Sequence, residues 1–313
     1  MNYGAKELTL NIEVEYLDKH GTMSNQNYYI SKLGLVKHMA IAGQRYAPTS
    51  KKIFKTIGMF LQYSYFLQSN SLNKDKFSLP PYNIYDPTEK AQFSNIAGKG
   101  IADFLAKKID NALHTVNYEA AMKIKKMPIV GSRPDLLAFT NNETFAIEAK
   151  GYATKYVKDM SEHKHQSQAG AIPVNFTVAS VSYDLYNKVK CKYHDPYNAN
   201  IPFDEELLSE TTKKYYSGII DFLEFSDYKE VKHKNESFYE IDILSSYFIN
   251  EYYSDTFRYF FHDLLHHNQL KLIVPKNITE YAEKGLDSHT EPFLYDSNEE
   301  IYIDNDRIGL KIT

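Results

Sequence analysis

The stretch GSRPDLLAFTNNETFAIEAKG, residues 131–151, decides the fold of this chain. Apolar residues alternate on both sides of Asn141-Asn142, a pair typical of a two-residue hairpin loop. The pattern predicts two antiparallel strands, Asp135–Phe139 and Thr144–Lys150. A four-residue loop with the same centre gives the same pairing, so the register tolerates some error in turn type.

In that register two acids and one amine converge. Phe139 faces Thr144, and Asp135 falls opposite Glu148, where Cβ atoms are roughly 4.5–5.5 Å apart. Two carboxylates so placed share a proton or a cation. Lys150 lies two residues after Glu148 and projects from the same strand face. Hard oxygen ligands suit Mg²⁺, and Lys150 is placed to orient or deprotonate a water that attacks a phosphodiester.

The flanking sequence supplies an α/β frame for this hairpin. Asp86-Pro87 has the chemistry of a helix start, and apolar residues then recur at helical spacing. We expect a helix over 86–113, a strand over Val116–Ile124, a polar helix over Thr154–Gln168 and a strand over Val174–Tyr183. The order is helix, three strands, helix, strand.

Pro134-Asp135 followed after twelve residues by Glu148-Ala149-Lys150 resembles the signature of the PD-(D/E)xK, restriction-endonuclease-like nuclease superfamily. The resemblance implies that family's core: a helix, a three-stranded meander, a helix and a strand around a mixed sheet. It also implies Mg²⁺, with Mn²⁺ able to substitute, bound by Asp135, Glu148 and the backbone carbonyl of Ala149. Lys150 then helps to activate the attacking water.

Further residues are weaker candidates for the same site. Many such nucleases carry another acid on the preceding helix. Asp103 is our choice over Asp110 and Glu119. Each of these acids is more simply interpreted as a surface charge. A local basic excess and the polar second helix suggest nucleic-acid contacts, with a solvated face as the alternative. The proposed contact residues are Lys123, Lys125, Lys126, Arg133, His165, Gln166 and Gln168.

The 313 residues are enough for a core with additions on both sides. We divide the chain into a mixed α/β accessory region (1–85), the nuclease core (86–200) and a C-terminal accessory region (201–313). The first contains a helical candidate near 51–67. The last is expected to be mainly helical, with a terminal hairpin near Asn305-Asp306.

Composition narrows the function classes. A single cysteine, Cys191, excludes an internal disulfide framework and a Cys-rich zinc site. No secretory or membrane-spanning pattern is visible, so we expect a cytoplasmic protein that does not enter a membrane. The net charge of −4 argues against non-specific coating of nucleic acid. Gly98-Lys99-Gly100 lacks the rest of a phosphate loop, so no ATP site is expected in this chain.

These observations favour a metal-dependent DNA endonuclease, with restriction or defence against foreign DNA as the role that the resemblance suggests. A homodimer or a larger defence complex stays open as the assembly. One alternative is a catalytically inactive nucleic-acid-binding or assembly protein on the same fold. A weaker one is a zinc hydrolase centred on His262 and His266, which lie one helical turn apart.

Overall fold

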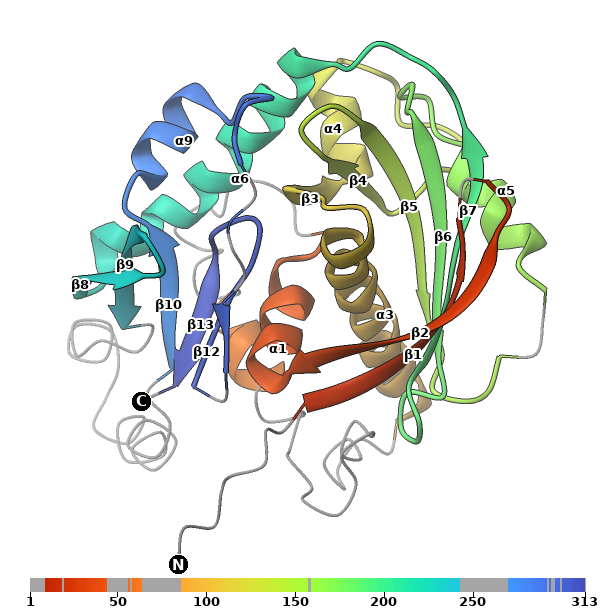
Figure 1. The fold of residues 1–313 in the computed structure, drawn as a ribbon, viewed down its shortest axis with the longest axis horizontal. Helices are drawn as coiled ribbons and strands as arrows, with labels where there is room; N and C mark the ends of the chain where they lie inside the picture. Colours follow the sequence, from red (N-terminus) through yellow and green to blue (C-terminus); the bar gives the residue numbers. More distant parts are fainter. Residues whose placement is uncertain are drawn as a thin grey trace, which may run out of the picture.

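The computed structural model describes residues 9–18, 20–43, 56, 58–63, 86–156, 159–242, 270–291, 293, 296–298 and 300–312. They form a mixed α/β structure with two sheets, and helices α1 and α3 lie between them (Figure 1). The expected α/β class is therefore confirmed. None of the helices in these ranges is both long and apolar enough to cross a membrane.

Seven strands form the first sheet, in the order β2-β1-β7-β6-β5-β4-β3. The pairs β1–β7 and β5–β6 are parallel and the other neighbours are antiparallel, so the sheet is mixed. Strands β1 and β2 come from the region before residue 85, which therefore contributes to the same sheet as residues 86–200. The strands are β1 (Thr9–Leu17), β2 (Met23–Ser31), β3 (His114–Asn117), β4 (Leu136–Phe139), β5 (Thr144–Gly151), β6 (Phe176–Tyr183) and β7 (Lys190–Asn198).

The β4–β5 hairpin has the predicted register. Phe139 pairs with Thr144, and the ladder runs back to Leu136 opposite Ile147. The Thr140 N–H donates to the Glu143 carbonyl at 2.9 Å across the loop. Strand β4 starts only at Leu136, so β5 extends four residues beyond the last paired position.

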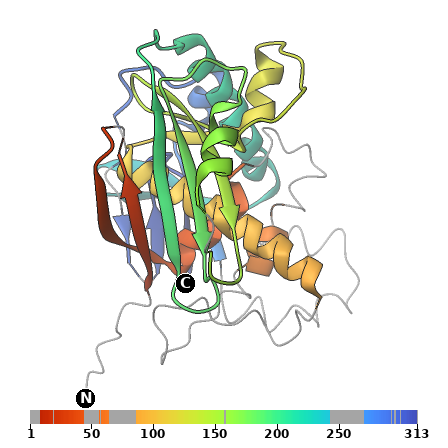
Figure 2. The same cartoon turned by 90° about the vertical axis from the view of Figure 1, so that its right-hand side faces the viewer.

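Helices cover both faces of this sheet. Helix α3 (Pro87–Ile109) begins as predicted, with the Asp86 carboxylate accepting from the Thr88 and Glu89 N–H groups, and it ends four residues earlier than expected. It contacts β5 and β6 on the inner face. Helix α5 (Ser161–Gln168) lies on the outer face, in front of the strands in Figure 2.

Two further segments differ from the sequence prediction by more than a few residues. The predicted strand Val116–Ile124 is a strand only to Asn117, and Tyr118–Ile124 forms helix α4. The Asn117 side chain accepts from the Ala120 N–H at 3.1 Å and so caps a segment of good helix formers. The polar helix starts at Ser161 rather than Thr154, and the Asp159 carboxylate accepts from the Ser161 N–H at 2.9 Å at this start.

The C-terminal region carries a sheet that we did not anticipate. Its described part holds helices α6 (Glu205–Phe225) and α9 (Ile278–Lys284) beside six strands in the order β11-β12-β13-β10-β9-β8, so it is not mainly helical. The terminal hairpin is present, since Ile303 pairs with Gly309. Most of segment 51–67 and both histidines of the zinc hypothesis lie outside the described residues. The strands are β8 (Tyr228–His233), β9 (Glu236–Asp242), β10 (Leu270–Pro275), β11 (Asp296–Ser297), β12 (Ile301–Ile303) and β13 (Gly309–Ile312).

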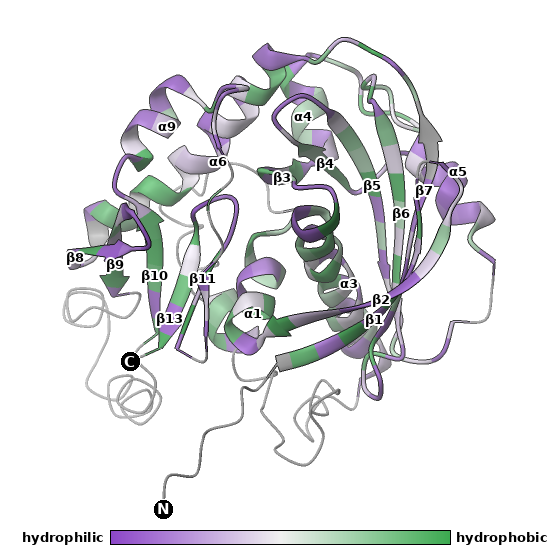
Figure 3. Cartoon of the chain, in the orientation of Figure 1, coloured by the Kyte–Doolittle hydropathy of each residue, from purple (hydrophilic) through white to green (hydrophobic). Residues whose placement is uncertain are grey.

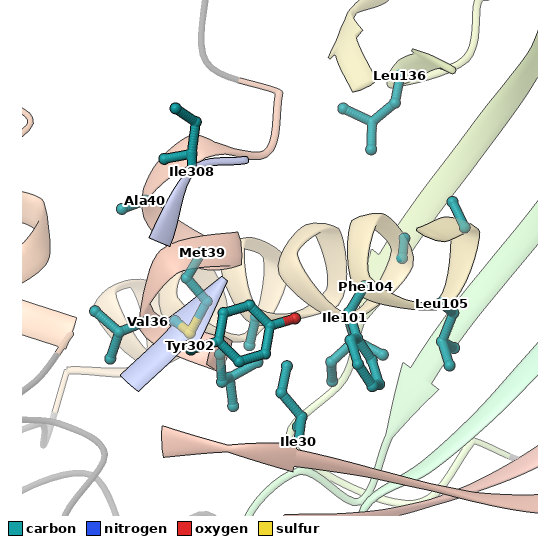
Figure 4. Close-up of a cluster of buried hydrophobic side chains, with 14 of the residues drawn as sticks. Ile30, Val36, Met39, Ala40, Ile101, Phe104, Leu105, Leu136, Tyr302 and Ile308 are labelled. Atoms are coloured by element: carbon teal, nitrogen blue, oxygen red, sulfur yellow. The ribbon is translucent and has the colours of Figure 1, made fainter. Parts of the chain in front are cut away.

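The apolar core fills the space between the sheets. Helix α1 (Lys32–Ile41) packs against α3 on one side and against β12 and β13 on the other. In Figure 4, the Tyr302 ring of β12 lies between Met39 of α1 and the side chains of Ile101 and Phe104 of α3, all within one buried cluster. In Figure 3 hydrophilic colours dominate α5, on the outer face, in keeping with its polar sequence.

A buried charge network crosses this core. The ammonium of Lys37 on α1 lies 2.6 Å from Asp304 and 2.7 Å from Asp306, both in the terminal hairpin. Lys107 on α3 contacts the same two carboxylates at 3.3 and 2.5 Å. All four side chains are nearly inaccessible to solvent. Buried charges are tolerated only when they are paired, so the network holds α1, α3 and the hairpin together.

Two glycines let α3 approach β5 unusually closely. A Cβ atom on Gly151 would lie 1.8 Å from the Ser94 carbonyl oxygen of α3, and one on Gly98 would lie 2.5 Å from the Gly151 nitrogen. Neither distance leaves room for a methyl group. The helix backbone therefore rests directly on the end of β5.

We predict that Gly151→Ala destabilises the protein by about 3 kcal/mol or more, because the new methyl forces helix and strand apart. Gly58→Ala is the matched control. Gly58 is helical, and a Cβ there would meet no atom of the described residues within 4 Å. Alanine should therefore leave the free energy of unfolding unchanged or raise it by up to about 1 kcal/mol. Urea unfolding measures both. Equal stability of Gly151→Ala and wild type would contradict the close packing.

Candidate functional site

The structure brings the three predicted residues together at the end of the hairpin. The Lys150 ammonium lies 2.6 Å from Glu148 Oε1 and 3.5 Å from Asp135 Oδ2. Glu148 is buried, whereas the side chains of Asp135 and Lys150 keep 17% and 31% of their surface exposed. The group is therefore closed to solvent at Glu148 and open to solvent at Asp135 and Lys150.

Asp135 precedes β4 and is not directly paired with Glu148, which corrects the sequence prediction at this point. Its N–H donates to the Ile147 carbonyl at 3.0 Å, one residue out of the hairpin register. Its carboxylate takes the place of a strand partner, because Oδ2 accepts from the Ala149 N–H at 3.2 Å. Since the N–H and C=O of one strand residue point to the same edge, the Ala149 carbonyl is also directed to the Asp135 side of β5.

Burial makes Glu148 an unusual acid. Desolvation, and then the nearby Asp135 charge, raise its pKa from the ordinary 4.5 to about 7 despite the opposing effect of Lys150. The pKa of Lys150 is raised in turn, because its two carboxylate neighbours outweigh the cost of burial. Near neutral pH the site can therefore gain or lose a proton at Glu148 while Lys150 stays charged.

Sequence reasoning missed a fourth residue, Lys99. Its ammonium, on α3, lies 2.7 Å from Asp135 Oδ1. Gly98 precedes it at the close contact with β5, so the packing of the two backbones carries Lys99 to the site. The sequence holds no local sign of this contact, because the two residues are brought together only by the fold.

Asp103, the weaker metal candidate, does not join these residues. It is buried one turn further along α3, where Oδ2 lies 2.6 Å from His38 Nδ1 and Oδ1 accepts from the Thr115 hydroxyl at 2.8 Å. Burial acts to raise the Asp103 pKa, but the Lys107 and His38 charges outweigh it and hold that pKa well below its usual range. Asp103 thus belongs to the charge network of the core. Asp110 accepts from the Tyr193 hydroxyl, and Glu119 pairs with Arg133.

The proposed nucleic-acid contacts lie on α4 and α5, in the turn that follows α4 and in the segment that precedes Asp135. Lys123 and Lys126 are exposed at the end of α4, and Lys125 forms an ion pair with Asp204. The Arg133 guanidinium is held by Glu119 and donates to the Gly131 carbonyl at 2.8 Å. These partners restrain two of the four basic side chains.

Helix α5 offers polar side chains beside the residues that precede Asp135. The Gln166 amide donates to the Arg133 carbonyl at 3.3 Å, so the helix contacts the segment leading into Asp135. His165 and Gln168 are exposed on the same helix. His163, in contrast, is buried, with Nε2 lying 3.4 Å from the Tyr152 hydroxyl.

The donors at the site fit one hard divalent cation. Both Glu148 oxygens are buried, and within the described residues neither accepts a hydrogen bond of regular geometry, although Lys150 is in ionic contact with one of them. Asp135 adds a half-open carboxylate and Ala149 a carbonyl directed to the same edge. Across the described ranges no group of three or more His, Cys, Asp or Glu side chains is arranged to hold a metal. A cation at this place would therefore have only two carboxylates and a backbone oxygen as ligands from the described residues.

We predict that the metal-free protein loses stability between about pH 5 and about pH 8 through Glu148. Its folded-state pKa of about 7 exceeds the ordinary 4.5, so in this interval the folded protein binds more protons and the free energy of unfolding falls as pH rises. At about 1.36 kcal/mol per pKa unit, Glu148→Gln should remove up to about 3 kcal/mol of this decline. Glu162→Gln, on exposed α5, is the control. Urea unfolding in EDTA at about pH 5 and about pH 8 gives the free energy of unfolding of each protein. An equally large fall between the two pH values in wild type and in Glu148→Gln would contradict the prediction.

Comparison with known proteins supplies no relative from which a role could be transferred. No protein-family model matches the chain, and no curated protein or solved structure matches it either. What the protein does is therefore inferred from the chemistry of its own side chains.

Proposed function

We propose that this protein is a Mg²⁺-dependent endonuclease that hydrolyses phosphodiester bonds in DNA. The observation that carries the proposal is the position of the Lys150 ammonium, 2.6 Å from Glu148 and 3.5 Å from Asp135, on the half-exposed end of a strand. Two acids that can hold a cation, next to an amine that can hold a water, are the groups required for metal-assisted hydrolysis.

The surrounding fold supports the same proposal. Helix α3, the antiparallel strands β3, β4 and β5, helix α5 and the parallel strand β6 follow one another in the order of a restriction-endonuclease-like core. Helix α4 is an insertion between the first two strands. Strands β1 and β2 and the six-stranded sheet are additions to that core.

Each residue has a distinct part in the proposed reaction. Asp135, Glu148 and the Ala149 carbonyl would hold Mg²⁺, which supplies positive charge against the phosphate and makes water a better nucleophile. Lys150 donates to the attacking water and orients it toward phosphorus. Among the described residues the Lys150 ammonium contacts only Oε1 of Glu148, so the buried Oε2 would be available to a cation.

Several exposed polar side chains suit a phosphate backbone. Lys123 on α4, Lys126 just after α4, and His165 and Gln168 on α5 can donate to phosphate oxygens without reading bases. We assign the protein to restriction or defence against foreign DNA on its resemblance to such nucleases. Cleavage of both strands of a duplex would take two sites, and hence a homodimer or a larger complex.

Purified protein should cleave plasmid, linear or single-stranded DNA with Mg²⁺ or Mn²⁺ and not in EDTA. Lys150→Ala should lower the rate by about 10²–10⁴-fold, because the water loses its orienting donor. Asp135→Ala should abolish cleavage by removing a ligand. Lys213→Ala, at a lysine paired with Glu210 on the surface of α6, should cut like wild type. Gel assays of product formation, with circular dichroism to verify folding, measure these rates.

Several outcomes would separate the alternatives. DNA binding without cleavage under all metal conditions would identify an inactive binding or assembly protein. Stoichiometric zinc that is lost in His262→Ala would identify a zinc site instead. Full activity in folded Lys150→Ala would remove Lys150 from the reaction.

A further inference from the structure

Lys99 gives the site a second ammonium group. Its Nζ lies 2.7 Å from Asp135 Oδ1, on the side of the carboxylate opposite to the contacts that Ala149 and Lys150 make with Oδ2. The Lys99 side chain keeps 33% of its surface exposed, so its ammonium also reaches solvent. One carboxylate is thus held by three donors from two elements.

The ammonium groups balance the carboxylates. Lys99 and Lys150 together match the charge of Asp135 and of ionised Glu148, so the site is close to neutral before a cation enters. A divalent ion would leave two positive charges in excess, close together and partly buried. A phosphodiester brings negative charge to the same place and relieves that excess.

We propose that Lys99 couples divalent-metal binding to nucleic-acid binding: its ammonium competes with the cation for Asp135 and pairs with a phosphodiester oxygen of the substrate. This inference rests on the proposed nuclease function and extends it to the order in which the metal and the nucleic acid bind. Metal binds weakly to the free protein and tightly once phosphate is present. By linkage, the metal strengthens nucleic-acid binding by the same factor.

The competition follows from the geometry at Asp135. Oδ2 already accepts from the Ala149 N–H, so Oδ1 is the oxygen that a cation would share with Lys99. Lys150 cannot replace Lys99 in this role, because it lies closer to Glu148 than to Asp135. A lysine on the rigid face of α3, fixed by the Gly98 contact with β5, therefore controls access to one of the two acids.

The test measures Mn²⁺ binding to the full-length protein rather than catalysis. Free Mn²⁺ is followed by electron paramagnetic resonance, with and without a phosphorothioate DNA oligonucleotide that resists cleavage. In wild type the oligonucleotide should raise Mn²⁺ affinity by about tenfold. In Lys99→Met the affinity of the free protein should rise by about tenfold, and the effect of the oligonucleotide should shrink correspondingly, because the competing charge is gone.

Two variants control for structure. Lys99→Arg keeps the charge and should restore the wild-type pattern. Lys90→Met removes a lysine from the start of the same helix, where it lies over the Tyr186 ring and away from Asp135, and should change neither affinity. Thermal unfolding verifies that each variant is folded.

The possible failures are distinguishable. If Mn²⁺ binding is lost in Asp135→Asn but unchanged in Lys99→Met, the coupling by Lys99 is wrong and the metal site stands. If wild type and Asp135→Asn bind Mn²⁺ equally, the metal site of the proposed function is wrong and the role of Lys99 falls with it. If Lys99→Met binds Mn²⁺ more weakly than wild type, Lys99 supports the site instead of competing for it.

Discussion

The contact between the backbones of Gly98 and Gly151 is the constraint on which the rest of the structure depends. Any side chain at either position would overlap the opposite backbone, so only glycine allows α3 to lie on the end of β5. The contact buries the inward face of β5, where Ile147 and Ala149 point into the core. It also brings a helix residue, Lys99, to a carboxylate that belongs to the hairpin. The same backbone contact therefore determines both the packing of β5 and the position of Lys99 beside Asp135.

The site combines two opposing physical demands. Glu148 is buried at a cost, and its raised pKa records how unfavourable the bare charge is there. Asp135 is mostly buried but contacts the Lys99 ammonium and the Ala149 N–H, so its charge is well compensated. The two acids therefore differ in how well the fold supports their charged forms, although they lie beside the same ammonium group.

The sequence predicted what depends on short-range periodicity. Alternation around Asn141-Asn142 gave the hairpin and its register, and Asp86 marked the start of α3. It failed where one side chain redirects the backbone, as Asn117 does, and where strands pair across long separations, as in the six-stranded sheet. Lys99 and Asp103 lie one turn apart on α3, yet one meets the site and the other the core. Helical spacing cannot tell them apart, because their surroundings come from distant segments.

The charge network beneath the site has a consequence for how the chain is made. Lys37 and Lys107 are sealed in the interior with carboxylates that belong to the terminal hairpin. A nascent polypeptide still lacking Asp304 and Asp306 would have to bury these ammonium groups with most of their counter-charges missing, which costs several kcal/mol per ion. The packing of α1 against α3 around these two lysines therefore depends on a hairpin that is translated long after both helices.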